Sequence, residues 1–342
     1  MHRRTFLAAA LLAGAPLTAR IAAYPAGTAV ETLARLLAEG YVVPAQGARY
    51  AAMLRAKLHA GGYRDFAAPA ALGAQLTADL RALSEDRHLR VVPIDSLPAG
   101  ERPAGGPTAD PSAPRAGPSR VPALQDAGWL AEDVAYLRYT GFTGDQAVMT
   151  ATQAFMRDHA GARALVIDCR YNGGGGIDEM NVFLPYLFAA PTDLVRFEMV
   201  DAVARRQGLP FEGPTVRPAG TVGGVVRNVH FVTPREDETR WRGAKLFYLI
   251  SPRTASAAEH LALAFKHSGR ATLIGSATAG ANHFGGFEPL GWGLAVFLPV
   301  GRTVDLTTGA DWEGVGVTPD VAIEPVMALQ EALRRAGVAV PT

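Results

Sequence analysis

The 342-residue chain has a single cysteine and almost no net charge. One cysteine, Cys169, excludes an internal disulfide and any metal site built from several cysteines. Because it ends an apolar run, Cys169 is best interpreted as a buried strand thiol. Lys and Arg number 33 against 32 Asp and Glu, and no run is rich in Lys or Arg. A protein that binds nucleic acid neutralises phosphates with a basic excess or stripe, so we expect no nucleic-acid partner.

Long apolar runs are lacking as well. No stretch reaches 18 uninterrupted apolar residues, so we expect a mature protein without a membrane span. The first residues have the layout of a secretory signal: the basic pair Arg3-Arg4 precedes an apolar stretch over residues 6–15, and small residues follow. The segment RRTFL also resembles a twin-arginine export signal. We therefore expect an export signal over residues 1–23 and a periplasmic or secreted protein, with a buried N-terminal helix as the alternative.

Helical periodicity dominates the next part of the chain. Between residues 28 and 83, apolar residues recur at spacings of three, four and seven or eight. This pattern predicts three short amphipathic helices, broken at Pro44 and at Gly61-Gly62. We assign residues 24–92 to an N-terminal helical domain.

Strand and helix patterns alternate in the C-terminal part, residues 123–342. The helical patterns cover residues 145–159 and 255–267. Largely apolar runs predict strands at residues 134–139, 164–169, 246–250, 272–274 and 294–298. This alternation is typical of an α/β sheet covered by helices.

Two stretches follow no regular period. Residues 93–122 hold eight Pro and four Gly and almost no large apolar side chain. They cannot bury enough surface to offset the entropy of ordering, so we predict an extended linker. Residues 191–241 are also rich in Gly and Pro, and we expect hairpins or a long insertion there.

A serine lies where a strand, a tight turn and a helix meet, in the segment SPRTASAAE at 251–259. The start of a helix offers free N–H groups and partial positive charge beside Ser256, and these can stabilise an oxyanion. Alternatively, Thr254 or Ser256 is an ordinary N-cap whose side chain accepts one of these N–H groups. Local sequence alone favours this alternative. The usual GxSxG nucleophile motif is absent.

Four glycines follow a buried strand in DCRYNGGGG at 168–176. Glycine permits positive φ and close backbone approach, so this loop could aim amides at an anion; a flexible loop is about equally plausible. No Gly-Lys-Ser/Thr or GxGxxG pattern supports phosphate binding.

None of the eight histidines shows a metal-ligand spacing such as HExxH, so we expect no metal and no cofactor. His88 lies in SEDRHLRVV, His283 lies in a glycine-rich loop, and Glu313 lies in ADWEGVGVTPD. His260 follows Ser256 on its helix. Spacing cannot choose among these candidates for acid–base work, because the members of a triad meet in space and not in sequence.

Together these segments resemble the tail-specific (C-terminal processing) serine protease superfamily, in the branch with tricorn protease and the interphotoreceptor retinoid-binding protein repeats. The matching segments occur in family order: the helices of 28–83, SEDRHL at 84–89, VAYLRYTGF at 134–142, ALVIDCRYNGGG at 164–175, LISPRTASAAE at 249–259, IGSATAGAN at 274–282 and DWEGVGVTPD at 311–320. The resemblance implies an N-terminal three-helix segment followed by an α/β core of the crotonase-like ββα type. It also implies a serine-type peptidase that acts on extended or unfolded peptides.

The resemblance assigns roles to five residues. Ser256 matches the nucleophile and lies three residues before Glu259, as in the Ser-Ala-x-Glu turn of the family. His88 matches the general base and Glu313 the carboxylate of the tricorn-like branch. Backbone amides of Gly174 and Ala257 correspond to the oxyanion hole.

Three departures from the family pattern qualify these roles. Ala281 stands where tail-specific proteases carry the lysine of a Ser–Lys dyad, which favours a Ser–His–Glu site. Those enzymes carry a PDZ domain between the helices and the catalytic core, where this chain has only the predicted linker of residues 93–122. Arg87 stands where the tricorn branch places a serine between the carboxylate and the histidine. Because retinoid-binding relatives are carriers, a non-catalytic carrier of retinoids or fatty acids is the alternative function.

Overall fold

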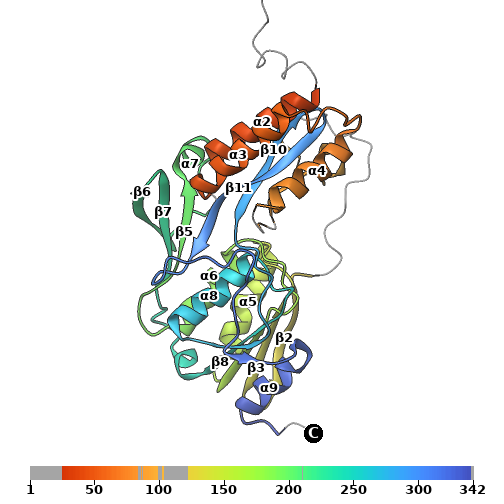
Figure 1. The fold of residues 1–342 in the computed structure, drawn as a ribbon. Coiled ribbons are helices and arrows are strands. Elements are labelled where there is room, and N and C mark those ends of the chain that lie inside the picture. The colour runs from red at the N-terminus through yellow and green to blue at the C-terminus, as the bar shows by residue number, and fades with distance from the viewer. Residues whose placement is uncertain are drawn as a thin grey trace, which may run out of the picture.

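The computed structural model describes residues 25–83, 86, 88–98, 102–103, 122–209 and 211–339. It contains two β-sheets, one above the other in Figure 1, and the N-terminal helices cover the upper sheet. The expected export signal and residues 104–121 of the predicted linker lie outside the described residues. No helix of the described ranges is long and apolar enough to cross a membrane.

The three predicted N-terminal helices are confirmed. They are α2 (Pro25–Gly40), α3 (Pro44–His59) and α4 (Pro69–Arg81). Proline begins α3 and α4 at a position where a helix needs no N–H donor. The apolar face of each helix is buried, with Leu33, Leu54 and Leu76 fully inaccessible to solvent.

The upper sheet is antiparallel, with strand order β1-β11-β5-β7-β6 and with β10 also paired to β11. Its strands are β1 (Arg90–Pro93), β5 (Thr192–Val200), β6 (Val216–Val222), β7 (Val225–Val232), β10 (Phe284–Gly291) and β11 (Leu294–Val304). Leu33 and Leu76 of the helices share one core with Leu294 and Leu298 of β11. The helical segment and the C-terminal part are therefore packed as one body here, across the expected domain boundary at residue 92.

Both irregular stretches contain more regular structure than the sequence indicates. The predicted linker begins with the last residue of β1 and a 3₁₀ helix, Ile94–Ser96, in which Ile94 is buried. Residues 191–241 contain β5, α7 (Asp201–Gln207) and the 3₁₀ helix Arg240–Gly243, and their strands β6 and β7 form a hairpin, as expected. The alternation of apolar and polar residues over 195–199 of β5 is a strand signal, which the Gly and Pro residues elsewhere in the stretch obscure.

The lower sheet has the order β12-β9-β8-β4-β3-β2, with β2 antiparallel and the other pairs parallel. Its strands are β2 (Leu124–Ala131), β3 (Val134–Tyr139), β4 (Ala164–Asp168), β8 (Lys245–Ile250), β9 (Thr272–Gly275) and β12 (Val321–Ala322). The helices α5 (Gln146–Asp158), α6 (Asp178–Leu187) and α8 (Ala257–Ser268) share the core on one face, and α9 (Ala328–Arg335) packs on the other. The expected α/β core is confirmed.

Three neighbouring parallel strands, β4, β8 and β9, end at the same edge of the lower sheet. The chain leaves them as the glycine-rich loop, the Ser256 turn and the segment that leads to β10. Loops at the carboxyl ends of parallel strands are the usual place for a site in an open α/β sheet.

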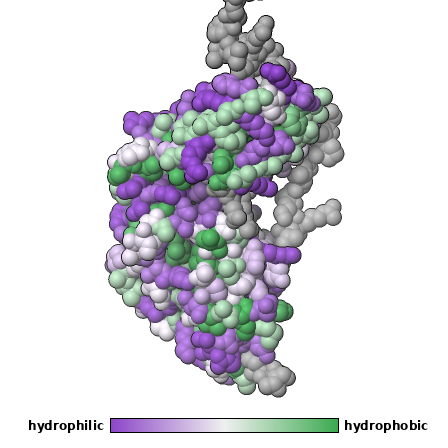
Figure 2. All heavy atoms as spheres, in the orientation of Figure 1, coloured by the Kyte–Doolittle hydropathy of each residue, from purple (hydrophilic) through white to green (hydrophobic). Residues whose placement is uncertain are grey.

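On the face drawn in Figure 2, the coloured residues mix hydrophilic and hydrophobic side chains without one dominant apolar band.

Candidate active site

Ser256 has an unusual backbone conformation. It lies between β8 and α8 with φ 53° and ψ −119°, and it is one of three non-glycine residues with positive φ among those described. Such a conformation costs on the order of 1–3 kcal/mol and persists only where the surroundings hold it. A sharp strand-to-helix turn of this kind exposes the serine side chain.

The buried carboxylate of Glu259 holds this turn. Its Oε2 accepts the N–H groups of Ser256 and Ala281, both at 2.8 Å, and Oε1 accepts the Thr278 hydroxyl at 2.6 Å and the Gly280 N–H at 2.7 Å. Glu259 is fully buried, so these four donors replace its hydration. The carboxylate thus ties the Ser256 turn to the loop that follows β9.

The glycine-rich loop lies directly against the serine. The carbonyl of Asn172 accepts the N–H of Ala255 at 2.9 Å. A Cβ at Gly174 would lie 2.7 Å from Ser256 Cβ and 2.8 Å from the Ala255 oxygen, and Gly174 has φ +99°. Only glycine fits there, because both the space and the backbone conformation exclude a side chain.

Two backbone amides beside Ser256 have no partner among the described residues. One is the N–H of Ala257, the first residue of α8, where no intrahelical acceptor exists. The other is the N–H of Gly175, which lines the same small pocket as Ser256 and Ala257. The N–H of Gly174, the donor expected from the sequence, is taken by Asn172 Oδ1 at 2.8 Å.

His88 and Glu313 lie together at the junction of the two sheets. Glu313 Oε2 is 3.6 Å from His88 Nδ1, an ion-pair distance longer than a hydrogen bond, and the His88 ring stacks on Phe297. The same oxygen accepts the N–H groups of Asn282 at 2.7 Å and His283 at 2.9 Å. Burial raises the pKa of Glu313, but contact with His88 and attraction to His283 outweigh burial and hold the pKa below its usual value.

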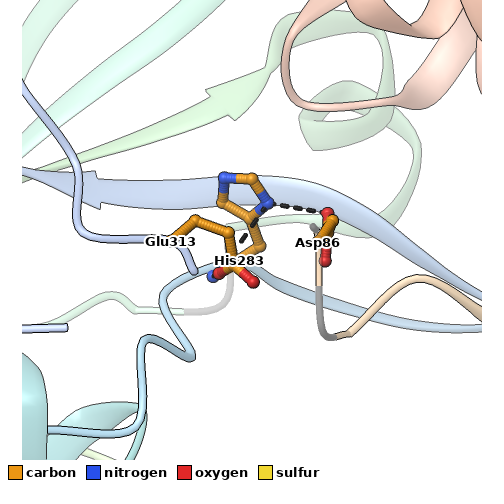
Figure 3. A group of neighbouring side chains, drawn as sticks. All are labelled: Asp86, His283 and Glu313. Carbon is orange, nitrogen blue, oxygen red and sulfur yellow. Dashed lines mark hydrogen bonds and ion pairs between the residues drawn. The ribbon is translucent and has the colours of Figure 1, made fainter. Parts of the chain in front are cut away.

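Asp86, which sequence reasoning missed, fixes the backbone at His88. Its Oδ1 accepts the N–H groups of His88 at 2.9 Å and Leu89 at 3.1 Å. Its Oδ2 accepts hydrogen bonds from the Tyr41 hydroxyl and from His283 Nδ1, both at 2.8 Å. Figure 3 shows the contact with His283. Burial alone would raise the pKa of Asp86, but these donors lower it overall.

His283 lies between three carboxylates. Besides the bond to Asp86, its Nε2 is 3.6 Å from Asp311 Oδ2 and its Nδ1 is 4.0 Å from Glu313 Oε2. Burial opposes a charge on the ring, but the contacts with Asp311 and Asp86 outweigh it and raise the pKa of His283 to about 9. His283 is therefore a cation at neutral pH and cannot accept a proton from a serine.

Asp86, His283 and Glu313 form a cluster of the side-chain types that bind metal ions. One atom each of Asp86, His283 and Glu313 lies within 4.8 Å of the others, which is close enough for a shared ion. Each group already has partners, however: His283 binds Asp86, and Glu313 accepts two backbone N–H groups. A protonated imidazole is not a metal ligand, so the ion pairs account for the cluster without a metal.

The structure places Ser256 near this cluster but not in direct contact with it. Asn282 connects the two, since it lines the Ser256 pocket while its N–H donates to Glu313. Among the described residues, no hydrogen bond joins Ser256 Oγ to His88, and His88 does not line the pocket. Arg87 lies outside the described residues.

Sequence comparison assigns the chain to a family. The family model of peptidase family S41 matches residues 133–323, and that of the N-terminal domain of peptidase S41 in eukaryotic IRBP matches residues 22–125. The first match covers more than half of the chain, so the chain belongs to peptidase family S41. Only residues 126–132 separate the two matches, which leaves no space for a PDZ domain between them.

Individual relatives agree with this assignment. The C-terminal processing peptidase of the Tetradesmus obliquus chloroplast is 29% identical over 199 residues, 58% of this chain and 37% of that protein. The chain thus spans well under half of this curated relative. A candidate peptidase from Parabacteroides merdae shares the fold with a TM-score of 0.59 at 14% identity, covering 93% of this chain and 100% of that one. A lipoprotein from Streptococcus agalactiae does so with a TM-score of 0.54 at 14% identity, over 91% and 96%.

Proposed function

We propose that this protein is a serine peptidase in which Ser256 attacks the peptide carbonyl. The observation that carries the proposal is the positive-φ turn of Ser256, held by buried Glu259 beside two unpartnered amides. Strain concentrated at a half-buried nucleophile that lines a pocket, with donors next to it, is the arrangement that acyl transfer needs. Family membership is in accord with this chemistry.

The oxyanion of the tetrahedral intermediate would be bound by the N–H groups of Ala257 and Gly175. Both line the pocket of Ser256 and both lack a partner among the described residues. Gly174 contributes in another way: without a side chain, it lets the loop approach the serine closely. Loss of one such donor typically lowers the rate about 10²–10³-fold.

His88 would take the proton of Ser256 and pass it to the leaving amine, and Glu313 would stabilise the imidazolium. The distance of 3.6 Å between Glu313 Oε2 and His88 Nδ1 supports this pairing. The proposal requires His88 and Ser256 to approach when substrate binds, because no hydrogen bond joins them here. Catalytic hydrogen bonds are often long in substrate-free enzymes and shorten in the complex.

The substrate would be an extended or unfolded peptide. Ser256 follows β8, an inner strand of the lower sheet, so the proposal rests on the C-terminal processing relative: the ends of protein chains are commonly poorly ordered and can reach the serine. A carrier of retinoids or fatty acids would need a large apolar cavity, whereas the cavity beside Ser256 holds only about 20 Å³.

Hydrolysis by the wild-type protein and by Ser256→Ala tests the proposal. We expect the wild type to cleave unfolded polypeptides and the variant to be inactive, with an unchanged circular dichroism spectrum. Equal activity in a folded variant would refute the role of Ser256. Stoichiometric binding of a fatty acid without any hydrolysis would favour the carrier.

We also propose that the protein is exported by residues 1–23. Export would bring Ser256 to extracytoplasmic peptides. Fractionation of cells that express the full chain, compared with an Arg3→Lys, Arg4→Lys variant, tests this: we expect the variant to remain in the cytoplasm. Equal distribution of both proteins would refute twin-arginine export.

A further inference from the structure

Two buried histidines form a hydrogen-bonded chain next to Ser256. His260 Nε2 lies 2.8 Å from His230 Nδ1, and His230 Nε2 lies 2.9 Å from Asn181 Oδ1. His260 is 3% exposed and His230 is not exposed at all. His260 lines the pocket of Ser256, whereas His230 and Asn181 do not.

Both rings are neutral. Burial lowers the pKa of His230 to about 4, and burial together with the neighbouring His230 lowers the pKa of His260 well below its usual value. Among the described residues, no acidic side chain is hydrogen-bonded to either ring, in contrast to His283.

The hydrogen-bond chain fixes the proton on each ring. The amide oxygen of Asn181 can only accept, so His230 Nε2 carries a proton and His230 Nδ1 is a bare acceptor. His260 Nε2 must therefore donate to it. A neutral imidazole has one proton, so His260 Nδ1 is left as a hydrogen-bond acceptor.

This acceptor is buried and has no partner among the described residues. The same is true of a donor, the indole N–H of Trp312, which lines the same pocket. An unmet buried polar group costs about 1–3 kcal/mol, so each of these two atoms needs a partner from outside the chain. A hydroxyl group both donates and accepts.

The rest of the pocket limits the size of this ligand. Phe197 stacks on His260 with ring centroids 5.0 Å apart, and Phe284 and Phe211 form further aromatic walls. The cavity holds about 20 Å³, a little more than one water molecule needs. A large or charged side chain does not fit between these rings.

We propose that the pocket binds a small hydroxyl-bearing side chain, serine or threonine, of the residue whose carbonyl Ser256 attacks, with His260 Nδ1 accepting the hydroxyl proton. This specificity rests on the proposed peptidase function. Asn181 and His230 act as positioning residues that keep His260 Nδ1 free of a proton.

Four peptides that differ at this one residue, Ser, Ala, Thr or Val, test the inference. Thr and Val have nearly the same shape, so their kcat/KM ratio isolates the hydroxyl. We expect ratios of about tenfold for Thr over Val and for Ser over Ala in the wild type, the worth of one buried hydrogen bond. In His260→Phe, which preserves an aromatic ring against Phe197, both ratios should fall to about one.

Two further variants isolate the role of the proton. Asn181→Leu removes the acceptor that fixes the chain and should lower the ratios, whereas Asn181→Gln retains an uncharged amide acceptor and should preserve them. The matched control is His267→Phe on the same helix: His267 faces Asp305 at 3.5 Å, outside this pocket, and its loss should leave the ratios unchanged. If His260→Phe fails to fold, the Asn181 pair still decides the result.

Three outcomes would overturn the inference or its basis. Ratios near one in the active wild type would refute the hydroxyl preference alone. A folded His260→Phe protein that no longer reacts with a fluorophosphonate would make His260 part of the nucleophile's machinery and overturn its role in specificity. A wild type that cleaves none of the peptides and does not react with the fluorophosphonate would refute the proposed function itself.

Discussion

Glu313 and His88 lie at ion-pair distance: Glu313 Oε2 is 3.6 Å from His88 Nδ1. The sequence left this contact open, because Arg87 replaces the serine that connects the two groups in the tricorn branch. Asp86 and the amides of Asn282 and His283 hold the two residues from either side. The pairing therefore depends on long-range contacts between the loops of two sheets.

Neutralising Glu313 should impair catalysis more than folding. In Glu313→Gln, the imidazolium of His88 loses its counter-charge, and we expect kcat/KM to fall on the order of 10⁴-fold, as typical for a lost triad carboxylate. Steady-state hydrolysis of one peptide measures the effect. Glu324→Gln, at an exposed position, is the control and should retain activity. Equal kcat/KM in the two variants would remove Glu313 from the site.

His283 should make stability depend on pH. Its pKa is about 9 in the folded protein and near 6.5 when unfolded, so the folded state binds the proton more tightly. The resulting stabilisation, on the order of 3 kcal/mol, is complete below about pH 6.5 and is lost as pH rises through 9. Urea unfolding at pH 6 and pH 9.5 should reveal this loss in the wild type.

A variant at His283 tests whether this residue causes the pH dependence of stability. His283→Gln cannot be protonated, so its free energy of unfolding should change less between pH 6 and pH 9.5 than that of the wild type. His59→Gln, at an exposed position, should behave like the wild type. The same pH dependence in His283→Gln would show that another group titrates.

A pair of glycines offers a test of the loop. A Cβ at Gly174 would clash with Ser256 and Ala255, whereas a Cβ at its neighbour Gly173 would meet nothing within 4 Å. We expect Gly174→Ala to destabilise the fold by about 1–3 kcal/mol and to abolish hydrolysis, and Gly173→Ala to be tolerated. Thermal unfolding and peptide hydrolysis measure both effects. An active Gly174→Ala protein would mean that the loop does not contact the serine.

The sequence predicts the strands and helices that have simple periods, and it places Ser256 and the glycine loop each after a strand; that the two strands are neighbours is seen only in the structure. The sequence also contains a signal for β5, the alternation of apolar and polar residues over 195–199, which the Gly and Pro residues elsewhere in that stretch obscure. Neither Asp86 nor the free amide of Gly175 has a local signal. Asp86 binds His283, which is 197 residues away in the chain. In the part of the chain that the structure describes, the amide of Gly175 is free because Asn172 Oδ1 accepts the N–H of Gly174 instead.

The central claim is that Ser256 is an activated nucleophile, and covalent labelling tests it most directly. The protein is treated with a fluorophosphonate, digested, and the modified residue is identified by mass spectrometry, with His88→Ala as a second sample. The proposed mechanism predicts one label per chain on Ser256, none on the buried Ser251, and a much slower reaction in His88→Ala. A folded wild-type protein without a label on Ser256, or with a rate independent of His88, would contradict it.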